Sequence, residues 1–588
     1  MQKTAAQGNK CSIRYVGLLA HPIVKLLLAT SLHGVLSHAR PAAEKVLGPT
    51  TEATSGAIAT ESLECSTIGK DLLARGGNAA DALVGATFCV GVIGMYHSGI
   101  GGGGFALVRD ANGSYEAIDF REAAGEAASE DMFQGNVAGS VYGGLAVGVP
   151  SEVRGLEYIH KKYGALPWKT VMQGAIHVAR DGFRVSEDLI RYINNTVRGQ
   201  PRNFLVEDPN WAQDFAPKGR LVQVGEIMTR KRYADTLETI ANQGADAFYT
   251  GKLAAAMVKH IQDYNGTLTA SDFASYKVLT RPVKNTTYRG IHLYTMGAPA
   301  SGPIALNFLK TMEQYHNDTS DDEALTTHRL TEAMRFAYGA RASLGDPDFV
   351  KETKALETRL LDTAYARHTR DRISDSHTLP VREYNPEGLA LPSSHGTSHL
   401  VTADASGMAT SLTTTVNLLF GAQIMEPGSG IILNNEMNDF SIPDTSNQFG
   451  FPPAPANFIR PFKRPLSSIT PIIAALPSGD LYATIGAAGG SRIISSTALS
   501  LWHILEQGKT LREALTQPRL HDQLMPNTVL LEEDGFDKNI VSGLKKRGHV
   551  VTWVAKGLSA VQGIIRQAGG QFEAVGEPRQ GNSAGLTI

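Results

Sequence analysis

The alternation of apolar and polar positions becomes regular from Gly56 onward. Residues 59–75 have the spacing of a helix that stops at a glycine pair, and residues 79–89 have the spacing of a second helix. Asn78 and Asp81 stand where the N-terminal cap residues of that second helix belong. The first part of the chain therefore predicts two consecutive helices joined by a short turn.

A glycine-rich loop at residues 97–104 separates these helices from a predicted hairpin. The hairpin strands are 105–108 and 115–120, with Asn112-Gly113 in the turn between them. Residues 150–380 are mostly helical in pattern. The clearest helical stretches there are 233–241 and 328–342.

The pattern changes after residues 380–394, which are rich in Pro, Gly, Ser and Asn and predict an exposed linker. Short strand-like runs follow, at 399–403, 409–416, 430–433, 469–475, 481–485, 529–531 and 550–554. Two helices are predicted among them, at 493–507 and 511–517. We therefore expect an α+β protein with stacked sheets and covering helices.

Composition adds limits to this picture. The chain has 588 residues, of which 42% are apolar and 19% charged, so it is globular and long enough for two to four ordinary domains. Its formal net charge of -2 gives no global basic field for nucleic acid or an anionic membrane. We therefore expect no nucleic-acid partner.

The N-terminus has the features of a targeting segment. Basic residues precede an interrupted apolar stretch that ends in Ser37-His38-Ala39, a pattern typical of signal peptidase sites. We expect residues 1–39 to be a signal peptide or an uncleaved anchor, with a disordered extension as the alternative. The chain is then secreted, or anchored facing the cell exterior or a vacuole lumen. Five Asn-x-Ser/Thr sequons support glycosylation in that pathway, at Asn112, Asn194, Asn265, Asn285 and Asn317.

The cysteines agree with an oxidising compartment. Cys11 falls in the targeting segment, which leaves Cys65 and Cys89 as a pair in the mature chain. Two buried free thiols are the alternative, because the spacing does not decide their geometry.

Three motifs fail on their context. The glycine run 99–104 matches the dinucleotide fingerprint, but a hairpin follows it where a helix is required. His395 and His399 have zincin spacing without the glutamate, and Ser429 lacks the glycines of a nucleophile elbow. We therefore expect no cofactor, no metal and no serine nucleophile of that type.

Thr397 is the strongest chemical candidate. It opens a predicted hairpin, 395–417, directly after Gly396 and the linker. Its hydroxyl can attack the Gly396 carbonyl and shift the amide to an ester that water cleaves. The freed α-amine, with an ordinary pKa of about 7.7–8, can then act as a base for the hydroxyl. We predict cleavage into a large subunit, 40–396, and a small subunit, 397–588; an inert Gly-Thr pair is the alternative.

Several motifs in order resemble the γ-glutamyltransferase family over roughly residues 56–585. In the second half they are 397–399 (TSH), 413–421 (TTTVNLLFG), 429–441 (SGIILNNEMNDFS), 465–468 (PLSS) and 489–493 (GGSRI). In the first half they are 119–122 (DFRE), 299–303 (PASGP), 328–338 (HRLTEAMRFAY) and 344–347 (LGDP). The resemblance implies an N-terminal-nucleophile hydrolase with an α+β fold, a four-layer αββα sandwich. It also implies that two subunits cut from one precursor form this sandwich jointly as a heterodimer.

The resemblance also implies roles for individual residues. Thr397 is the nucleophile, Thr415 bonds to it, and Gly489 and Gly490 form the oxyanion hole. Arg121, Ser467 and Ser468 bind the α-carboxylate of the substrate. Its α-ammonium is bound by Asn417, Glu436 and Asp439. Cys65 and Cys89 form a disulfide. Asn438 departs from the acidic residue common in the family, and an acidic Glu436 indicates the eukaryotic branch.

The function so implied is a γ-glutamyltransferase and glutathione hydrolase without a cofactor. It cleaves glutathione and other γ-glutamyl compounds and passes the γ-glutamyl group to water, an amino acid or a dipeptide. A cephalosporin- or glutaryl-type acylase of the same fold is one alternative, although its acyl group lacks the α-amine that Glu436 and Asp439 would hold. A catalytically inactive surface homologue is the other.

Overall fold

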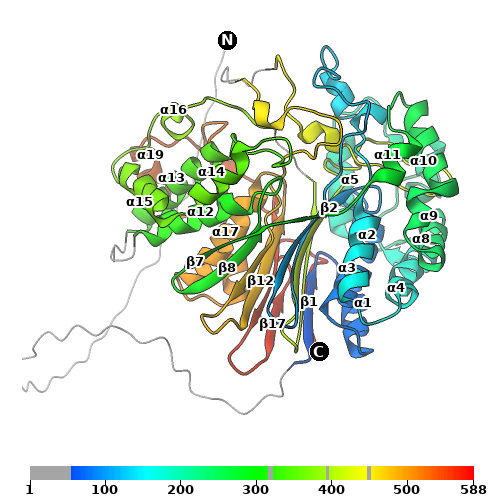
Figure 1. The fold of residues 1–588 in the computed structure, drawn as a ribbon, viewed down its shortest axis with the longest axis horizontal. Coiled ribbons are helices and arrows are strands. Elements are labelled where there is room, and N and C mark those ends of the chain that lie inside the picture. The colour runs from blue at the N-terminus through cyan, green and yellow to red at the C-terminus, as the bar shows by residue number, and fades with distance from the viewer. Residues whose placement is uncertain (1–53, 316–321, 393–395, 446–451) are drawn as a thin grey trace, which may run out of the picture. The chain divides into compact units, whose positions relative to one another are not determined.

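Two antiparallel sheets lie face to face at the centre of the fold (Figure 1). The computed structural model describes residues 54–315, 322–392, 396–445 and 452–588. The larger sheet has the strand order β18-β1-β9-β10-β2-β3-β6. Its strands are β1 (Gly56–Thr60), β2 (Gly103–Arg109), β3 (Tyr115–Phe120), β6 (Leu279–Arg281), β9 (Ser398–Asp404), β10 (Ala409–Thr415) and β18 (Ala584–Thr587).

The second sheet has the strand order β17-β16-β12-β11-β8-β7. Its strands are β7 (Val283–Tyr288), β8 (Ile291–Met296), β11 (Ile472–Ala475), β12 (Leu481–Ala488), β16 (Ala560–Arg566) and β17 (Phe572–Val575). Two small sheets are peripheral, made by β4 (Phe183–Arg184), β5 (Ile227–Met228), β13 (Leu520–His521), β14 (Val529–Glu532) and β15 (Val551–Val554).

Helices cover the outer face of each sheet (Figure 1). The layer on the larger sheet contains α1 (Leu63–Ala74), α2 (Ala79–Ile93), α3 (Glu152–Tyr163), α4 (Trp168–Asp181), α5 (Glu187–Val197), α8 (Lys231–Gln243), α9 (Asp246–Tyr249), α10 (Gly251–Asp263) and α11 (Ala270–Ser275). The layer on the second sheet contains α12 (Gly302–Glu313), α13 (Glu323–Arg341), α14 (Glu352–Leu360), α15 (Thr363–Arg372), α16 (Val381–Tyr384), α17 (Arg492–Leu505), α18 (Leu511–Thr516) and α19 (Lys538–Lys546). The predicted αββα sandwich is confirmed.

Two apolar cores hold these layers together. One fills the space between the larger sheet and its helices, with Phe88 of α2 and Phe120 of β3 fully buried. The other runs between the sheets and on to the second helix layer, where Phe105 of β2 and Ile485 of β12 belong to one cluster. Side chains on alternate positions of the central strands therefore serve both cores.

Local predictions are confirmed where the polar signals are strong. The Asn78 side chain accepts bonds from the backbone N–H groups of Ala80 and Asp81, and the Asp81 side chain accepts one from Asn78. This capping box starts α2, which continues past the predicted residue 89 to Ile93. The predicted glycine loop, both hairpins and the disulfide between Cys65 and Cys89 are also present.

Three local predictions are wrong. Residues 59–60 end β1, and the helix begins only at Leu63. All five residues of β1 are buried between neighbouring strands, and such a short apolar run has no alternation that distinguishes a strand from a helix. Residues 430–433 form only an isolated bridge between Met425 and Ile432. The predicted exposed linker contains α16, where Tyr384 is buried and its hydroxyl donates to Glu332.

Both central sheets combine strands from each side of the predicted cleavage point. In the larger sheet β1, from the first half, lies between β18 and β9 of the second half. In the second sheet β8 pairs with β11 in the same way. The two segments on either side of the predicted cleavage point therefore share both sheets and the helix layer on the second sheet, within one compact unit, Glu52–Ile588.

Residues 1–39, for which we predict a targeting segment, lie outside the described residues and include Cys11. The sequon asparagine Asn317 lies outside them as well. The other four sequon asparagines, Asn112, Asn194, Asn265 and Asn285, are exposed. In the part of the chain that the structure describes, no helix is both long and apolar enough to cross a membrane.

Candidate active site

Thr397 lies immediately before β9, the strand between β1 and β10 in the larger sheet. Its hydroxyl donates to the carbonyl oxygen of Gly396, the residue before it. Thr415, the last residue of β10, donates to the same oxygen at 2.8 Å and accepts a 2.7 Å bond from the Asn417 N–H. Two hydroxyls therefore meet at the carbonyl of the peptide bond that the sequence predicts to be cut.

Gly396 occupies a position that only glycine fits. A Cβ atom there would collide with the carbonyl oxygen of Asn417. Asn417 itself has a φ of 70°, a left-handed conformation that turns the chain away from β10 and brings its carbonyl against Gly396. Close backbone approach therefore fixes the peptide bond beside Thr415.

A small pocket surrounds this bond. Its free volume of about 10 Å³ is barely enough for one water molecule. The lining includes eight of the predicted catalytic and substrate-binding residues, Arg121, Thr397, Thr415, Asn417, Glu436, Asp439, Ser467 and Ser468, together with Gly396, Ile469 and Ile493. Residues that are more than 300 positions apart in sequence thus converge on one point.

The charged residues of the pocket contact one another. Arg121 is 1% exposed, its Nη1 pairs with Glu436, and its Nη2 lies 2.5 Å from Asp439 Oδ2. Burial alone would lower the pKa of Arg121, but the carboxylates of Glu436 and Asp439 raise it above its ordinary value. The residues predicted to hold opposite ends of a substrate are therefore paired with each other in this structure.

Acidic groups outnumber the cation. Glu122 lies 4.0 Å from Arg121, and burial raises the pKa of Glu122 to about 7. Burial also raises the pKa of Glu436 well above its ordinary value, although Arg121 opposes the shift. Three carboxyl groups around one guanidinium favour the binding of an additional cationic group. The sequence analysis does not assign Glu122 to the site, although its position next to Arg121 could have indicated it.

Gly489 and Gly490 are outside the pocket lining. They connect β12 to α17 with φ values of 129° and 60°, conformations that favour glycine. A Cβ at Gly489 would come within 2.7 Å of the Leu558 carbonyl oxygen. Ile493, three residues further on, does line the pocket. The oxyanion-hole assignment stays a prediction.

The departure at Asn438 also lies outside the pocket lining. Its side-chain amide donates a 2.8 Å bond to Ser140 Oγ. Asn438 therefore stabilises the 3-10 turn Glu436–Asp439 by a contact outside the pocket, while Glu436 and Asp439 contact Arg121.

A buried polar cluster lies behind the first residue of β9, and the sequence interpretation missed it. Ser398 Oγ lies 2.8 Å from Glu61 Oε1, 2.9 Å from Ser98 Oγ and 3.0 Å from His97 Nδ1. Burial raises the pKa of Glu61 to about 8 and lowers that of His97 to about 3, so both groups are mainly neutral at pH 7. The cluster anchors β9 directly beside Thr397.

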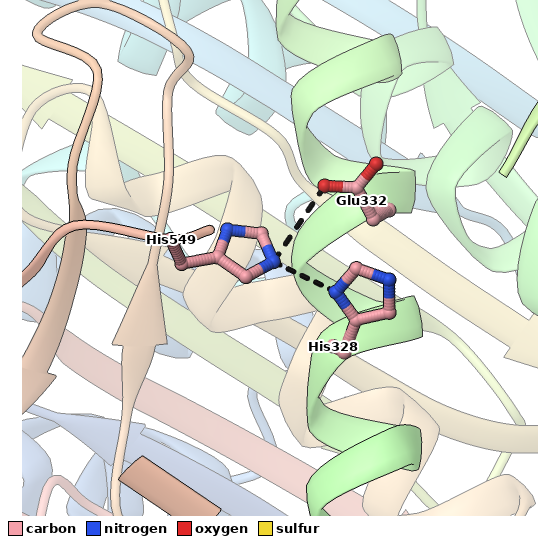
Figure 2. A group of neighbouring side chains, drawn as sticks. All are labelled: His328, Glu332 and His549. Atoms are coloured by element: carbon pink, nitrogen blue, oxygen red, sulfur yellow. Dashed lines mark hydrogen bonds and ion pairs between the residues drawn. The ribbon is translucent and has the colours of Figure 1, made fainter. Parts of the chain in front are cut away.

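A second buried cluster joins the two halves of the chain (Figure 2). His328 and Glu332 lie on α13, and His549 follows α19. His328 Nε2 bonds to the Ser374 carbonyl, which leaves Nδ1 to accept a 2.7 Å bond from His549 Nε2. Glu332 Oε1 lies 3.7 Å from that same nitrogen, and its other oxygen accepts from Tyr384.

The donor atoms of this cluster lie within 4.8 Å of one another, which is close enough to consider a metal ion. Two nitrogens on one tetrahedral zinc ion are roughly 3.3 Å apart, given Zn–N distances near 2.05 Å. The 2.7 Å separation of His328 and His549 is shorter and fits a hydrogen bond. We therefore interpret the cluster as a hydrogen-bonded joint between the segments before and after Thr397.

Known proteins share both the sequence and the fold. The family model described as Gamma-glutamyltranspeptidase matches residues 65–587. A glutathione hydrolase proenzyme of Arthroderma benhamiae is 50% identical over 550 residues, 91% of this chain and 93% of that protein. A glutathione hydrolase of Aspergillus flavus is 46% identical over 533 residues, 90% of this chain and 89% of that protein.

Among solved structures, a cephalosporin acylase from Bacillus halodurans superposes with a TM-score of 0.79 at 24% identity, over 94% of this chain and 99% of that one. At that identity the likeness establishes the fold alone. The family model spans nearly all of the described chain, and each of the two relatives covers at least 90% of the whole chain. The chain therefore belongs to the gamma-glutamyltranspeptidase family.

Proposed function

We propose that this protein is a γ-glutamyl acyltransferase and glutathione hydrolase with Thr397 as its N-terminal nucleophile. The observation that carries the proposal is the charge arrangement beside Thr397, where Arg121 faces Glu436 and Asp439. A γ-glutamyl group ends in an α-carboxylate and an α-ammonium, which match one guanidinium and two carboxylates. The names of the fungal relatives, glutathione hydrolase, support the same substrate.

Maturation comes first in this proposal. Thr397 Oγ attacks the Gly396 carbonyl carbon, the bond from that carbon to the Thr397 nitrogen breaks, and the nitrogen takes up the hydroxyl proton. Water then hydrolyses the resulting ester, which leaves a carboxylate on Gly396 and a free amine on Thr397. The Thr415 hydroxyl, 2.8 Å from the Gly396 oxygen, supports the negative charge that develops there.

Removal of Gly396 from the pocket supplies room for the donor. The substrate carboxylate binds Arg121 with the help of Ser467 and Ser468, and its ammonium binds Glu436, Asp439 and Asn417. The ion pairs of Arg121 with Glu436 and Asp439 are thereby exchanged for pairs with the ligand. Because the charges remain paired, the exchange avoids leaving a buried charge without a partner.

Turnover then proceeds through an ester. The Thr397 amine accepts the hydroxyl proton as Oγ attacks the γ-carbonyl, and the proton passes to the departing amine. The backbone N–H groups of Gly489 and Gly490 are the proposed donors to the oxyanion. Water or the amine of an amino acid or dipeptide attacks the γ-glutamyl ester, the acyl group leaves, and the proton returns to Thr397 Oγ.

The two segments are proposed to remain together as a heterodimer in the secretory pathway. The interleaved strands of both sheets support a lasting association of the two segments. The secretory pathway is supported by the disulfide between Cys65 and Cys89 and by the exposed sequon asparagines. The compartment is either the cell exterior or a vacuole lumen.

Donor selectivity tests the proposal against the acylase alternative. Purified protein is incubated with a γ-glutamyl anilide and with the corresponding glutaryl anilide, which lacks only the α-amine, each with and without glycylglycine. We expect turnover of the γ-glutamyl donor and acceleration by glycylglycine. Turnover of the glutaryl donor alone would overturn the assignment, and turnover of neither by a cleaved protein would favour an inactive homologue.

A further inference from the structure

A cavity of about 520 Å³ lies where three segments of the chain meet. Its walls come mainly from residues 136–145, from residues 263–265 at the end of α10, and from residues 422–424. The Gly144 N–H donates a 2.8 Å bond to the Tyr264 carbonyl, which joins two of these walls. The cavity is therefore preformed, and its volume is within the range of small-molecule binding sites.

The lining of this cavity combines aromatic rings with side-chain amides. The rings are those of Tyr142 and Tyr264, which are 47% and 44% exposed. The amides belong to Asn136, Gln200 and Gln423. Such a wall offers apolar faces for stacking together with hydrogen-bond donors and acceptors.

The charge of the lining is small. Of the described residues that line the cavity, only Asp263 is charged, and its carboxylate lies 2.5 Å from the ammonium group of Lys259. An ion would find no unpaired opposite charge there. The lining therefore favours a neutral polar ligand that also has an apolar face.

A covalent attachment point is part of the same wall. Asn265 lines the cavity, is exposed, and begins the sequon Asn265-Gly266-Thr267. It follows α10 with a φ of 64°, a left-handed conformation that asparagine tolerates. The other three described sequon asparagines are outside the lining, namely Asn112, Asn194 and Asn285. A sugar attached to Asn265 therefore starts at the cavity.

We propose that Asn265 carries an N-linked glycan whose first N-acetylglucosamine units lie in this cavity against Tyr142 and Tyr264. The C–H face of such a sugar stacks on an aromatic ring, and its hydroxyl and acetamide groups bond to side-chain amides. In the attachment step, Asn265 Nδ2 bonds to C1 of the sugar as the bond from C1 to the diphosphate of a lipid-linked oligosaccharide breaks. The lipid diphosphate leaves, and the amide loses one proton.

The glycan would brace a segment that contacts the substrate-binding turn. Ser140 Oγ accepts a 2.8 Å bond from the Asn438 side chain, and the Val141 carbonyl accepts a 2.9 Å bond from the Asn435 side chain. Both acceptors belong to the 136–145 wall of the cavity. The inference rests on the secretory part of the proposed function and extends it to one structural role for one sequon.

Release of the glycans from the folded protein tests this position. The full chain, made in the secretory pathway of a eukaryotic cell, is treated with a peptide N-glycosidase, and mass spectrometry follows the conversion of each sequon asparagine to aspartate. We expect release at Asn265 to be roughly tenfold slower or more than at the other occupied sequons, because the sugar must first leave the cavity. After denaturation all sites should react alike.

Two variants show whether stacking causes the protection. Tyr142→Ala removes one ring without touching the sequon, and we expect release at Asn265 to approach the rate at the other sites. Phe349→Ala changes another exposed aromatic residue, also outside the lining, and should leave the slow release unchanged. The site occupancy of each protein comes from the same mass spectra.

Three results would overturn the inference. They are an unmodified Asn265, release at Asn265 as fast as at the other sites, and slow release that Tyr142→Ala leaves unchanged. Absence of a glycan at every sequon would overturn it too and would also contradict the proposed compartment. The proposed catalytic activity is tested separately, by turnover of the γ-glutamyl anilide.

Hydrogen exchange provides a measurement that does not depend on Tyr142→Ala. The glycosylated wild type is compared with Asn265→Gln, and Asn112→Gln is the control for loss of a different sequon. We expect amides of residues 136–145 and 422–424 to exchange roughly threefold faster or more in Asn265→Gln alone, because the glycan no longer joins the walls. Equal exchange in wild type and Asn265→Gln would contradict the inference.

Discussion

Thr415 Oγ1 donates a 2.8 Å hydrogen bond to the carbonyl oxygen of Gly396. Because this hydroxyl accepts a bond from the Asn417 N–H, its own proton is directed at the carbonyl. The bond polarises the carbonyl that Thr397 is proposed to attack. We therefore expect Thr415, which pairs with Gly103 of β2 at the end of β10, to assist the proposed maturation.

Thr415→Val tests that contact with almost no change in side-chain volume. We expect self-cleavage to slow by roughly 100-fold, because one donor to the developing oxyanion is removed. A time course on a denaturing gel measures the rate. Thr358→Val, the same change on the exposed face of α14, should cleave at the wild-type rate, and an equally fast Thr415→Val would refute the role.

Gly396→Ala tests the close approach of the backbone. The added Cβ collides with the carbonyl oxygen of Asn417, so the bond to be cut must move from its place beside Thr415. We expect the variant to remain mainly uncleaved while keeping a far-UV circular dichroism spectrum like that of wild type. Gly581→Ala, where a Cβ meets no atom within 4 Å, is the control that should cleave normally.

Arg121→Lys tests the grip on the donor. Lysine keeps the charge but cannot form the planar fork that contacts Glu436 and Asp439, so we expect KM for a γ-glutamyl donor to rise roughly tenfold or more. Steady-state kinetics on the cleaved variant measure this. An unchanged KM would place the donor carboxylate elsewhere.

The joint in Figure 2 predicts a pH effect on stability. Burial lowers the pKa of His549 to about 3 from its ordinary 6.5. Below pH 6.5 His549 takes up a proton in the unfolded chain but stays neutral in the folded protein. The free energy of unfolding therefore falls with acidification, by up to about 1.4 kcal/mol per pH unit. Above pH 6.5 this residue contributes no pH dependence.

His549→Gln isolates that contribution. Melting temperatures are compared at pH 7 and pH 5 for wild type and variant. We expect the variant to start lower at pH 7, because the bond to His328 is altered, and to lose less on acidification than wild type. An identical loss in both proteins would show that His549 titrates normally. His177→Gln, at an exposed position on α4, serves as the control.

The fold class and most individual elements could be predicted because their signals are local. The cap at Asn78 and the alternation in β9 and β10 act within a few residues. The strand β1 could not be assigned because its five buried residues show no alternation, and β8, β16 and β18 pair with strands that are distant in sequence. Sheet order is a tertiary property that short patterns do not contain.

The site was predictable by residue but not by contact. The motifs identified Arg121, Glu436 and Asp439, yet only the fold shows that Arg121 pairs with both carboxylates. Burial and charge balance are set by residues far apart in sequence.

Peptide mapping by mass spectrometry, after rapid quenching of the enzyme with a γ-glutamyl donor, tests the central claim most directly. The account predicts a small subunit that begins at Thr397 and carries the γ-glutamyl group as an ester on that residue, with Thr397→Ala remaining a single unlabelled chain. An active enzyme that is uncleaved, or whose γ-glutamyl group is attached to any other residue, would contradict it.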